Sequence, residues 1–247
     1  CGLAPSNKQA RQLVEQGGAW TVDWADFEEK LKSADLFLLC SPHNPVGIVW
    51  TREELWRMME LCLKYHVPVL SDEIHSDLIF HGRKHIPTAS LSPEIAANVI
   101  TGISGTKTFN LAGLQASTAI FPNAHKKAVF DKFWMNMDIH RNNAFSLTAM
   151  EAAFTGGEEW LEQLLPYLSA NLDFVAGFCA RRIPKIKTWA PDATYLMWLD
   201  CRDLGLSNDL IQLIAADPLF GMTEQELTAH LEPARYIGRC PQQVEEF

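Results

Sequence analysis

Three polar side chains stand just past apolar runs that have the length of buried strands. They are Asn44, Asp72 and Lys107. Their side chains are an amide, a carboxylate and an amine, which are groups that can act together in catalysis. Open α/β sheets gather their ligand-binding groups at the carboxyl ends of the strands. We therefore expect these three side chains to lie along one edge of a sheet. The preceding apolar runs cover residues 36–40, 67–71 and 98–104.

The lysine is the group that suggests a particular chemistry. A lysine held among carboxylate, amide and hydroxyl groups in a desolvated site can have a lowered pKa and form a Schiff base with a carbonyl compound. A carboxylate such as Asp72 in the same cleft would keep a pyridine nitrogen protonated, which turns the ring into an electron sink. Ser104 and Thr106 flank Lys107 with hydroxyls that could hold a phosphate oxygen. The combination predicts a site for pyridoxal 5'-phosphate.

The segment from residue 36 to residue 71 predicts the unit that positions the first two groups. The run 36–40 is apolar throughout, as expected for a strand that is covered on both faces. Thr51, with Glu54 three positions later, has the form of a capping box that starts a helix. That helix has one apolar face at helical spacing, formed by Leu55, Met58, Met59 and Cys62. With the strand at 67–71 it forms a right-handed crossover in a parallel sheet.

The remaining elements extend this pattern to a sheet flanked by helices. A short helix is expected at 24–32, strands at 98–104 and 116–121, and long helices at 125–140 and 158–182, the last one interrupted by Pro166. Strands at 186–189 and 195–200 predict a second, smaller α+β unit, with a boundary near Ile183 and Pro184. The tryptophans at positions 134, 160, 189 and 198 are expected in the core. The predicted fold class is α/β with a mostly parallel sheet and a partial, smaller C-terminal domain.

Composition restricts the partners. The chain has 247 residues, of which 47% are hydrophobic and 21% charged, as is usual for globular domains. A formal charge of -9 without clustered Lys and Arg argues against a nucleic-acid surface. No apolar run reaches the length needed to cross a membrane, and no leader opens the chain, so we expect a cytoplasmic protein. The chain begins with Cys1 rather than Met, which suggests that it does not begin at a natural start.

The six cysteines are far apart and form no C-x-x-C pair. Most have apolar neighbours, so we expect reduced and buried thiols rather than a disulfide framework. They are Cys1, Cys40, Cys62, Cys179, Cys201 and Cys240.

Three motifs resemble a known family. Ser-Pro-His-Asn-Pro-Val-Gly at 41–47, Ser-Asp-Glu-Ile-His-Ser-Asp-Leu at 71–78 and Thr-Lys-Thr-Phe-Asn-Leu-Ala-Gly-Leu-Gln at 106–115 are similar to those of pyridoxal-phosphate enzymes of aminotransferase fold type I. More narrowly, they resemble its cystathionine beta-lyase (C–S lyase) branch, over about residues 10 to 205. The resemblance implies an incomplete large domain over 1–182 and the start of a small domain over 183–206.

The resemblance also implies roles for single residues. Lys107 would carry the cofactor and move the proton at Cα, Asp72 would pair with the pyridinium nitrogen, and Asn44 would bind the phenolic oxygen of the ring. His75 falls where many aminotransferases have a tyrosine, which favours the lyase branch. The remaining implied roles are phosphate binding by Ser104 and Thr106, a border of the substrate pocket at Tyr195, and Gln115 in place of a phosphate-binding arginine.

The implied reaction is β-elimination from a small sulfur-containing amino acid, which gives pyruvate, ammonia and a thiol. An aminotransferase on the same fold and a non-catalytic fragment are the alternatives. The family is dimeric, so a homodimer is expected if the fold is completed. The family's N-terminal segment, which binds the cofactor phosphate and stacks an aromatic residue on the ring, and its C-terminal arginine for the substrate carboxylate are not matched here.

Two other features have separate interpretations. Residues 208–247 resemble the C-terminal tail of adenylosuccinate lyases but carry none of that family's catalytic motifs, so a fused or truncated reading frame is expected. A metal site is the alternative for a group of acidic and histidine residues that lacks the H-x-x-x-H spacing of a helical site. No metal is predicted. The group is Asp72, His75, Asp77, His81 and His85.

Overall fold

The computed structural model describes residues 21–138, 143–204 and 223. Its contacts divide the chain into two compact units, Cys1–Phe178 with Thr188–Trp198, and Cys179–Lys187 with Leu199–Phe247. All of the residues predicted to bind cofactor or substrate belong to the first unit. The division predicted from the sequence, at residues 182 and 206, stays a prediction. The adenylosuccinate-lyase-like tail lies outside the described residues, apart from Thr223.

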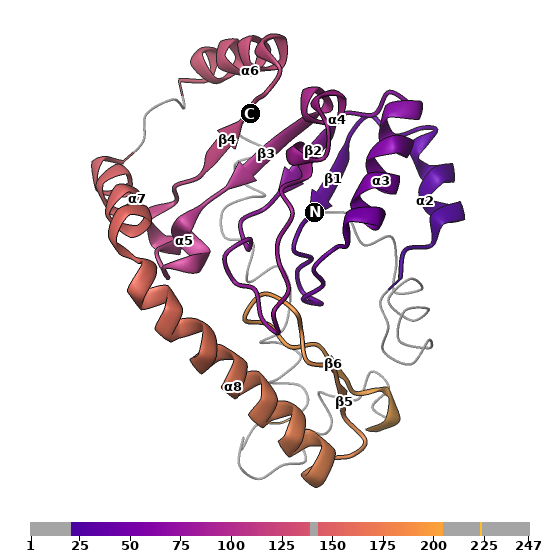
Figure 1. The fold of residues 1–247 in the computed structure, drawn as a ribbon, viewed down its shortest axis with the longest axis vertical. Coiled ribbons are helices and arrows are strands. Elements are labelled where there is room, and N and C mark those ends of the chain that lie inside the picture. The colour runs from indigo at the N-terminus through magenta and orange to yellow at the C-terminus, as the bar shows by residue number, and fades with distance from the viewer. Residues whose placement is uncertain (1–20, 139–142, 205–222, 224–247) are drawn as a thin grey trace. The chain divides into compact units, whose positions relative to one another are not determined.

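A four-stranded sheet organises the first unit (Figure 1). Its order is β1-β2-β3-β4, with β1, β2 and β3 parallel and β4 antiparallel to β3, which confirms the predicted mostly parallel α/β sheet. The register pairs Cys40 with Asp72 and Asp72 with Gly102, so the carboxyl ends of three neighbouring strands are level. The strands are β1 (Phe37–Cys40), β2 (Val69–Asp72), β3 (Val99–Ile103) and β4 (Thr118–Ile120).

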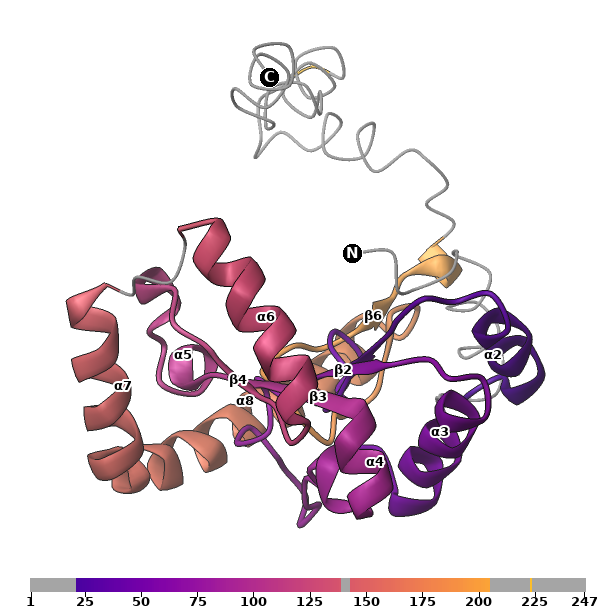
Figure 2. The same ribbon diagram turned by 90° about the horizontal axis from the view of Figure 1, so that it is seen from above.

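Three helices contribute to the core with these strands. They are α2 (Trp24–Leu31), α3 (Arg52–Lys64) and α4 (Pro93–Asn98), and α3 and α4 lie side by side against β2 and β3 (Figure 2). The capping box of α3 is confirmed, because Glu54 N donates to Thr51 Oγ1 at 3.2 Å and Thr51 N donates to Glu54 Oε2 at 2.9 Å. Ser92 caps α4 in the same way, by accepting from Ile95 N at 3.1 Å.

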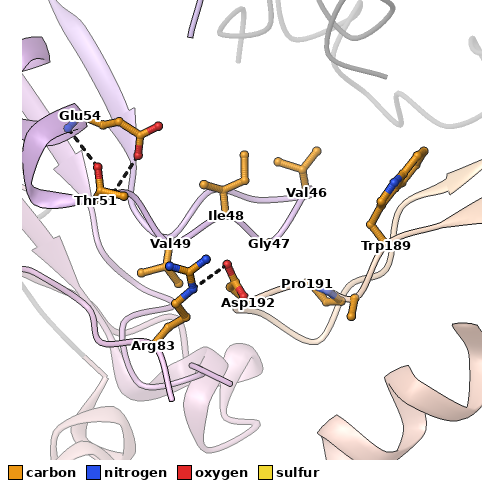
Figure 3. A pocket seen from close by; sticks show the side chains of 11 residues that line it. Val46, Gly47, Ile48, Val49, Thr51, Glu54, Arg83, Trp189, Pro191 and Asp192 are labelled. Atoms are coloured by element: carbon orange, nitrogen blue, oxygen red, sulfur yellow. Dashed lines mark hydrogen bonds and ion pairs between the residues drawn. The ribbon is translucent and has the colours of Figure 1, made fainter. Parts of the chain in front are cut away.

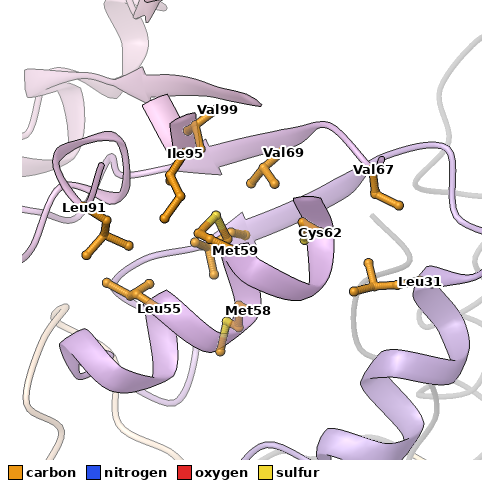
Figure 4. Packing of buried hydrophobic residues seen from close by; sticks show 11 residues of the cluster. Leu31, Leu55, Met58, Met59, Cys62, Val67, Val69, Leu91, Ile95 and Val99 are labelled. Carbon is orange, nitrogen blue, oxygen red and sulfur yellow. The ribbon is translucent and has the colours of Figure 1, made fainter. Parts of the chain in front are cut away.

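The predicted apolar face of α3 forms the centre of the core (Figure 4). Its four residues are buried and pack with Val69 and Val99 from the sheet. Burying side chains of this size is worth about 1.5–3 kcal/mol each. Packing along the length of α3 therefore fixes the crossover from β1 to β2 against the sheet. It also fixes the level at which each of these strands ends.

The remaining helices are three short ones and three long ones. The short ones are η1 (Thr88–Ser90), which precedes β3, and α5 (Gly105–Thr108) and η2 (Ala112–Leu114), which follow it. The long ones are α6 (Ala124–Asn136), α7 (Ala144–Gly156) and α8 (Glu158–Arg182). A separate two-stranded sheet is formed by β5 (Lys187–Thr188) and β6 (Leu199–Asp200), followed by η3 (Arg202–Leu204).

Two expectations from the sequence were wrong, and one helix was not predicted. Helix α8 continues through Pro166. A proline removes one backbone N–H donor, but the turns on both sides keep their backbone hydrogen bonds. Helix α7 was not predicted. Trp134 and Trp160 are 37% and 45% exposed, so they are not core residues.

The described part of the chain contains four of the six cysteines. Cys40, Cys62, Cys179 and Cys201 are free thiols, of which Cys62 and Cys179 are buried and the other two partly so. Among the described residues, no helix is long and apolar enough to cross a membrane.

Candidate active site

The ends of the three parallel strands bring the predicted residues to one edge of the sheet. Asp72 is the last residue of β2, Asn44 lies in the loop after β1, and Lys107 lies in α5, which begins two residues after β3 (Figure 1). Since the register aligns these strand ends, the three groups follow adjacent strands. This is the arrangement expected from the sequence.

His75 lies at the centre of this group. The residue is only 2% exposed, and Asn44 Nδ2 lies 3.3 Å from its Nε2. The ring of Tyr195 meets the imidazole edge to face, with ring centroids 5.9 Å apart. Burial lowers the pKa of His75, the negative charge of Asp72 opposes that change, and the positive charge of Lys107 adds to it. The structure thus brings four of the predicted residues near the imidazole of the fifth, His75.

The second nitrogen of His75 has no hydrogen-bond partner among the described residues. His75 Nδ1 is buried. With the amide nitrogen of Asn44 donating to Nε2, the neutral ring carries its hydrogen on Nδ1. A buried N–H without an acceptor is costly, and such groups are expected to pair. The Nδ1–H of His75, the Asn44 amide and the charges of Asp72 and Lys107 fit a pyridinium ring, which has a protonated nitrogen and an anionic phenolic oxygen.

Helix α5 is fixed from two directions. Thr108, which is fully buried, donates from Oγ1 to Asp77 Oδ2 at 2.8 Å and so joins α5 to the loop after β2. Phe109, at the end of α5, packs against Phe154 of α7 and Trp160 of α8, with ring centroids 6.0 and 5.7 Å away. The backbone that carries Lys107 is therefore held between the loop after β2 and two helices.

The predicted phosphate ligands are bonded to each other. Ser104 caps α5 by accepting from Thr106 N at 3.0 Å, and its hydroxyl donates to Ala116 O at 2.5 Å. The two hydroxyl oxygens lie 2.7 Å apart. Because Ser104 gives its hydrogen to Ala116, Thr106 is the donor in this pair. Gln115 is exposed, with a left-handed backbone. The phosphate role of Ser104 and Thr106 stays a prediction.

Cys40 supports Asn44 from the end of β1. Its Sγ donates to Pro42 O and accepts from Asn44 N, both at 3.3 Å. Burial raises the pKa of this thiol, and the hydrogen bond from Asn44 N only partly offsets the effect. The thiol therefore stays protonated near neutral pH, which the bond to Pro42 requires.

Sequence analysis missed four residues that support the site. Asp77 and Thr108 join α5 to the loop after β2, and Glu73 pairs with His85, whose Nε2 lies 2.8 Å from Glu73 Oε2. Asp77 and His85 had been considered only as metal ligands. The signal for Asp77 and Glu73 was their position inside the motif at 71–78. Nothing in the sequence indicated their partners, which lie 31 and 12 positions away.

A separate cavity of about 320 Å³ lies beside the loop after β1 (Figure 3). Gly47, Trp189 and the start of α3 line it, and Arg83 Nε contacts Asp192 Oδ2 at 3.1 Å at its edge. None of the predicted cofactor residues lines this cavity. The candidate site is therefore the sheet edge where the reactive groups converge, and not this cavity.

The described ranges contain no group of three or more His, Cys, Asp or Glu side chains that could hold a metal ion. Four of the five residues considered as metal ligands have hydrogen-bond partners in the protein, which are Ile74 N for Asp72, Asn44 for His75, Thr108 for Asp77 and Glu73 for His85.

The chain is similar in sequence and fold to enzymes that bind pyridoxal 5'-phosphate. It is 46% identical over 202 residues to cystathionine beta-lyase PatB of Bacillus subtilis (strain 168), covering 81% of this chain and 52% of that protein. Cystalysin from Treponema denticola, solved with pyridoxal 5'-phosphate, matches with a TM-score of 0.75 and 30% identity over 81% of this chain and 52% of its own. The pyridoxal-phosphate-bound C–S lyase from Staphylococcus hominis matches with a TM-score of 0.72 and 31% identity, over 81% and 53%.

The chain spans about half the length of the curated relatives that it matches. The sequence model of the family "Aminotransferase class I and II" matches residues 10–231, which is most of the chain and includes every residue of the candidate site. The chain therefore belongs to the aminotransferase class I and II family.

Proposed function

We propose that this chain is the cofactor-carrying part of a pyridoxal-phosphate-dependent C–S lyase. The reaction is β-elimination from a small sulfur-containing amino acid, with pyruvate, ammonia and a thiol as products. The observation that carries the proposal is the meeting of one amine, one carboxylate and one amide around His75, at the carboxyl edge of a parallel sheet. The similarity to PatB, a cystathionine beta-lyase, and to the C–S lyase of Staphylococcus hominis supports the same reaction.

The residues of this chain have separate tasks in the proposed reaction. When bound, pyridoxal phosphate supplies an electron sink for negative charge at the substrate Cα. Lys107 Nζ would hold the cofactor at its aldehyde group and would be the base for the substrate Cα proton. Asp72 would keep the ring nitrogen protonated. Asn44 has a second amide hydrogen, beyond the one on His75, for the phenolic oxygen.

The hydroxyl of Thr106 can turn from Ser104 to a phosphate oxygen without moving the backbone, because a hydroxyl rotates freely. Tyr195, 40% exposed and in contact with His75, borders the substrate side. In this proposal His75 keeps the amide of Asn44 oriented and offers Nδ1–H toward the bound ring or substrate. These assignments give each predicted residue except Ser104 a contact that its present surroundings allow, and Ser104 keeps its bonds to Ala116 O and Thr106.

We also propose that the protein acts as a homodimer in the cytoplasm. Large apolar side chains on α6, α7 and α8 support a covered surface, since Phe133, Phe145 and Phe174 are 59%, 77% and 66% exposed. Where such side chains gather into one patch, they are typical of surfaces that bind another protein. Light scattering of the purified chain measures its mass, and a monomeric mass at micromolar concentration would count against the homodimer.

A lyase and an aminotransferase share their first steps, so the products decide between them. The chain is incubated with pyridoxal phosphate and cystathionine, without any keto acid, and pyruvate is measured. A lyase releases pyruvate continuously, whereas an aminotransferase needs a keto-acid acceptor to turn over. Lys107→Ala is the matched control and should release none. Turnover that depends on an added keto acid would favour the aminotransferase alternative.

A further inference from the structure

Glu73 follows Asp72 directly and points the opposite way, into the interior. Asp72 is exposed at the site, whereas Glu73 is only 2% exposed. Its carboxylate accepts three hydrogen bonds, from Ser71 Oγ at 2.8 Å, from Thr88 N at 2.9 Å and from His85 Nε2 at 2.8 Å. A carboxylate has no hydrogen to donate, so His85 supplies the hydrogen in the last of these.

These bonds keep a buried acid charged. Burial on its own raises the pKa of Glu73, but the hydrogen bonds from His85, Thr88 N and Ser71 outweigh burial and leave the pKa below its ordinary value. His85 is itself mostly enclosed, with 11% of its side chain exposed. Charge-assisted hydrogen bonds of this kind are about twice as strong as neutral ones. The carboxylate therefore anchors the chain firmly at position 73.

The anchored residue lies between two residues of the site. Its backbone N–H donates to Gly102 O of β3 at 2.8 Å, and its carbonyl accepts from Ser76 N at 3.0 Å. Asp72 precedes it, and His75 follows two positions later. Any rotation of the backbone at Glu73 would turn both of them away from the sheet edge. Within the described residues, no other side chain in the 72–78 loop has this many bonds to the interior.

We propose that Glu73 and His85 are positioning residues, which hold the 72–78 loop so that Asp72 and His75 face the bound cofactor. The pair acts through the backbone and touches neither cofactor nor substrate. Ser71 and Thr88 complete this hydrogen-bond network. Their hydroxyl oxygens lie 3.0 Å apart and are hydrogen-bonded, and both residues also donate to Glu73. The inference rests on the proposed function for its purpose, although the position of the loop can be measured without cofactor.

Three variants separate positioning from simple stability. His85→Leu removes the donor to Glu73, His85→Gln keeps a side-chain N–H at this place, and Glu73→Gln keeps the acceptor oxygen for Ser71 and Thr88 N. Thr51→Ala is the matched control, because it destabilises α3 through its cap without touching the loop. The first readout is the nitrogen NMR spectrum of His75 in the cofactor-free chain, assigned with His75→Gln. The second is the dissociation constant of pyridoxal phosphate.

The wild-type chain should show His75 with its hydrogen on Nδ1. His85→Leu should lose this signature and weaken cofactor binding by roughly 10- to 100-fold, the scale expected when binding groups are misplaced by about an ångström. His85→Gln should recover most of both, and Thr51→Ala should change neither. If His85→Leu does not fold, Glu73→Gln is the variant that decides, and it should alter His75 in the same direction.

The inference is overturned if His75 and the cofactor affinity are unchanged in a folded His85→Leu or Glu73→Gln chain. It is also overturned if Thr51→Ala changes them equally, since the effect would then follow general stability. Failure of the wild-type chain to bind cofactor would count against the proposed function alone. In that case the His75 spectrum still decides whether Glu73 and His85 set the loop.

Discussion

Thr108 donates a hydrogen bond from its Oγ1 to Asp77 Oδ2 over 2.8 Å. Thr108 is the neighbour of Lys107 on α5, and Asp77 lies in the loop that carries His75 and follows Asp72, the last residue of β2. One bond thus connects the element with the reactive amine to the element with the acid. Since Thr108 is fully buried, water cannot easily take the place of either partner.

Breaking this bond should loosen the site and the fold together. We expect Thr108→Val and Asp77→Ala each to lower the free energy of unfolding by about 1–3 kcal/mol, because the remaining partner is left unpaired. The double variant should cost less than the two single changes added, by about 0.5–3 kcal/mol. Urea unfolding of the four proteins measures this coupling. Strictly additive effects would show that the bond contributes nothing.

Gly47 provides a second test, through the contact between the loop after β1 and the segment at 190–193. Gly47 and Gly82 both have left-handed backbones, with φ of 71° and 69°. A Cβ at Gly47 would lie 2.2 Å from Pro191 Cβ, whereas a Cβ at Gly82 would meet nothing within 4 Å. Gly82→Ala therefore measures the backbone cost alone, which is about 1–2 kcal/mol.

Gly47→Ala should destabilise the chain by about 1–3 kcal/mol more than Gly82→Ala, the usual cost of overpacking. Gly47 O also accepts from Asp192 N and Ala193 N, so the loop cannot move aside without losing these bonds. The free energy of unfolding of both variants is measured under one condition. Equal losses would mean that Pro191 gives way without cost.

The strand ends and their reactive residues could be predicted from the sequence because their signals are local. Apolar runs mark β1, β2 and β3, and Asn44, Asp72 and Lys107 stand in motifs that follow them. Because parallel strands end level, these residues had to share an edge. The capping residues Thr51 and Glu54 were equally readable, since the two bond within one helical turn.

Contacts between distant segments could not be predicted in this way. The bond from Thr108 to Asp77 joins residues 31 positions apart, and no periodicity encodes it. Helix α7 was missed because its apolar residues surround the helix and give no period of 3.6. Trp134 and Trp160 were expected inside by residue type alone, but type does not say which surface of a helix is covered.

Acid should weaken the fold through its buried histidines. Burial lowers the pKa of His43 from an ordinary value of 6.5, and burial with the positive charge of Lys107 lowers that of His75 against the opposing charge of Asp72. The folded chain therefore binds fewer protons than the unfolded chain just below pH 6.5. This stabilisation is complete above that pH and is lost as the pH falls through the lowered values, at up to about 1.4 kcal/mol per pH unit for each histidine.

His43→Phe keeps a ring against Trp50 but cannot take up a proton. We expect its free energy of unfolding to depend less steeply on pH between about 5 and 6.5 than that of the wild type. Denaturant unfolding at several pH values in this range measures the slopes. Identical slopes would show that His43 titrates alike in the folded and unfolded chain.

Asp72 should matter for cofactor affinity much more than for stability. Asp72→Asn removes the negative charge that would hold the ring proton, so pyridoxal phosphate should bind roughly 10- to 100-fold more weakly, the value of a charged hydrogen bond of about 1.5–3 kcal/mol. Asp131→Asn, an exposed carboxylate on α6 paired with Lys127, is the control and should bind as the wild type does. An absorbance titration gives both constants. Equal affinity of Asp72→Asn and wild type would remove Asp72 from the cofactor site.

The amine of Lys107 is tested by trapping the cofactor on it. The chain is incubated with pyridoxal phosphate, reduced with borohydride, digested and analysed by mass spectrometry, beside Lys107→Arg, which keeps the charge but cannot form the bond. We predict that the label lies on the peptide containing Lys107 and disappears in Lys107→Arg. A label that is absent from the wild-type chain, or is equally present in Lys107→Arg on other lysines, would contradict the account.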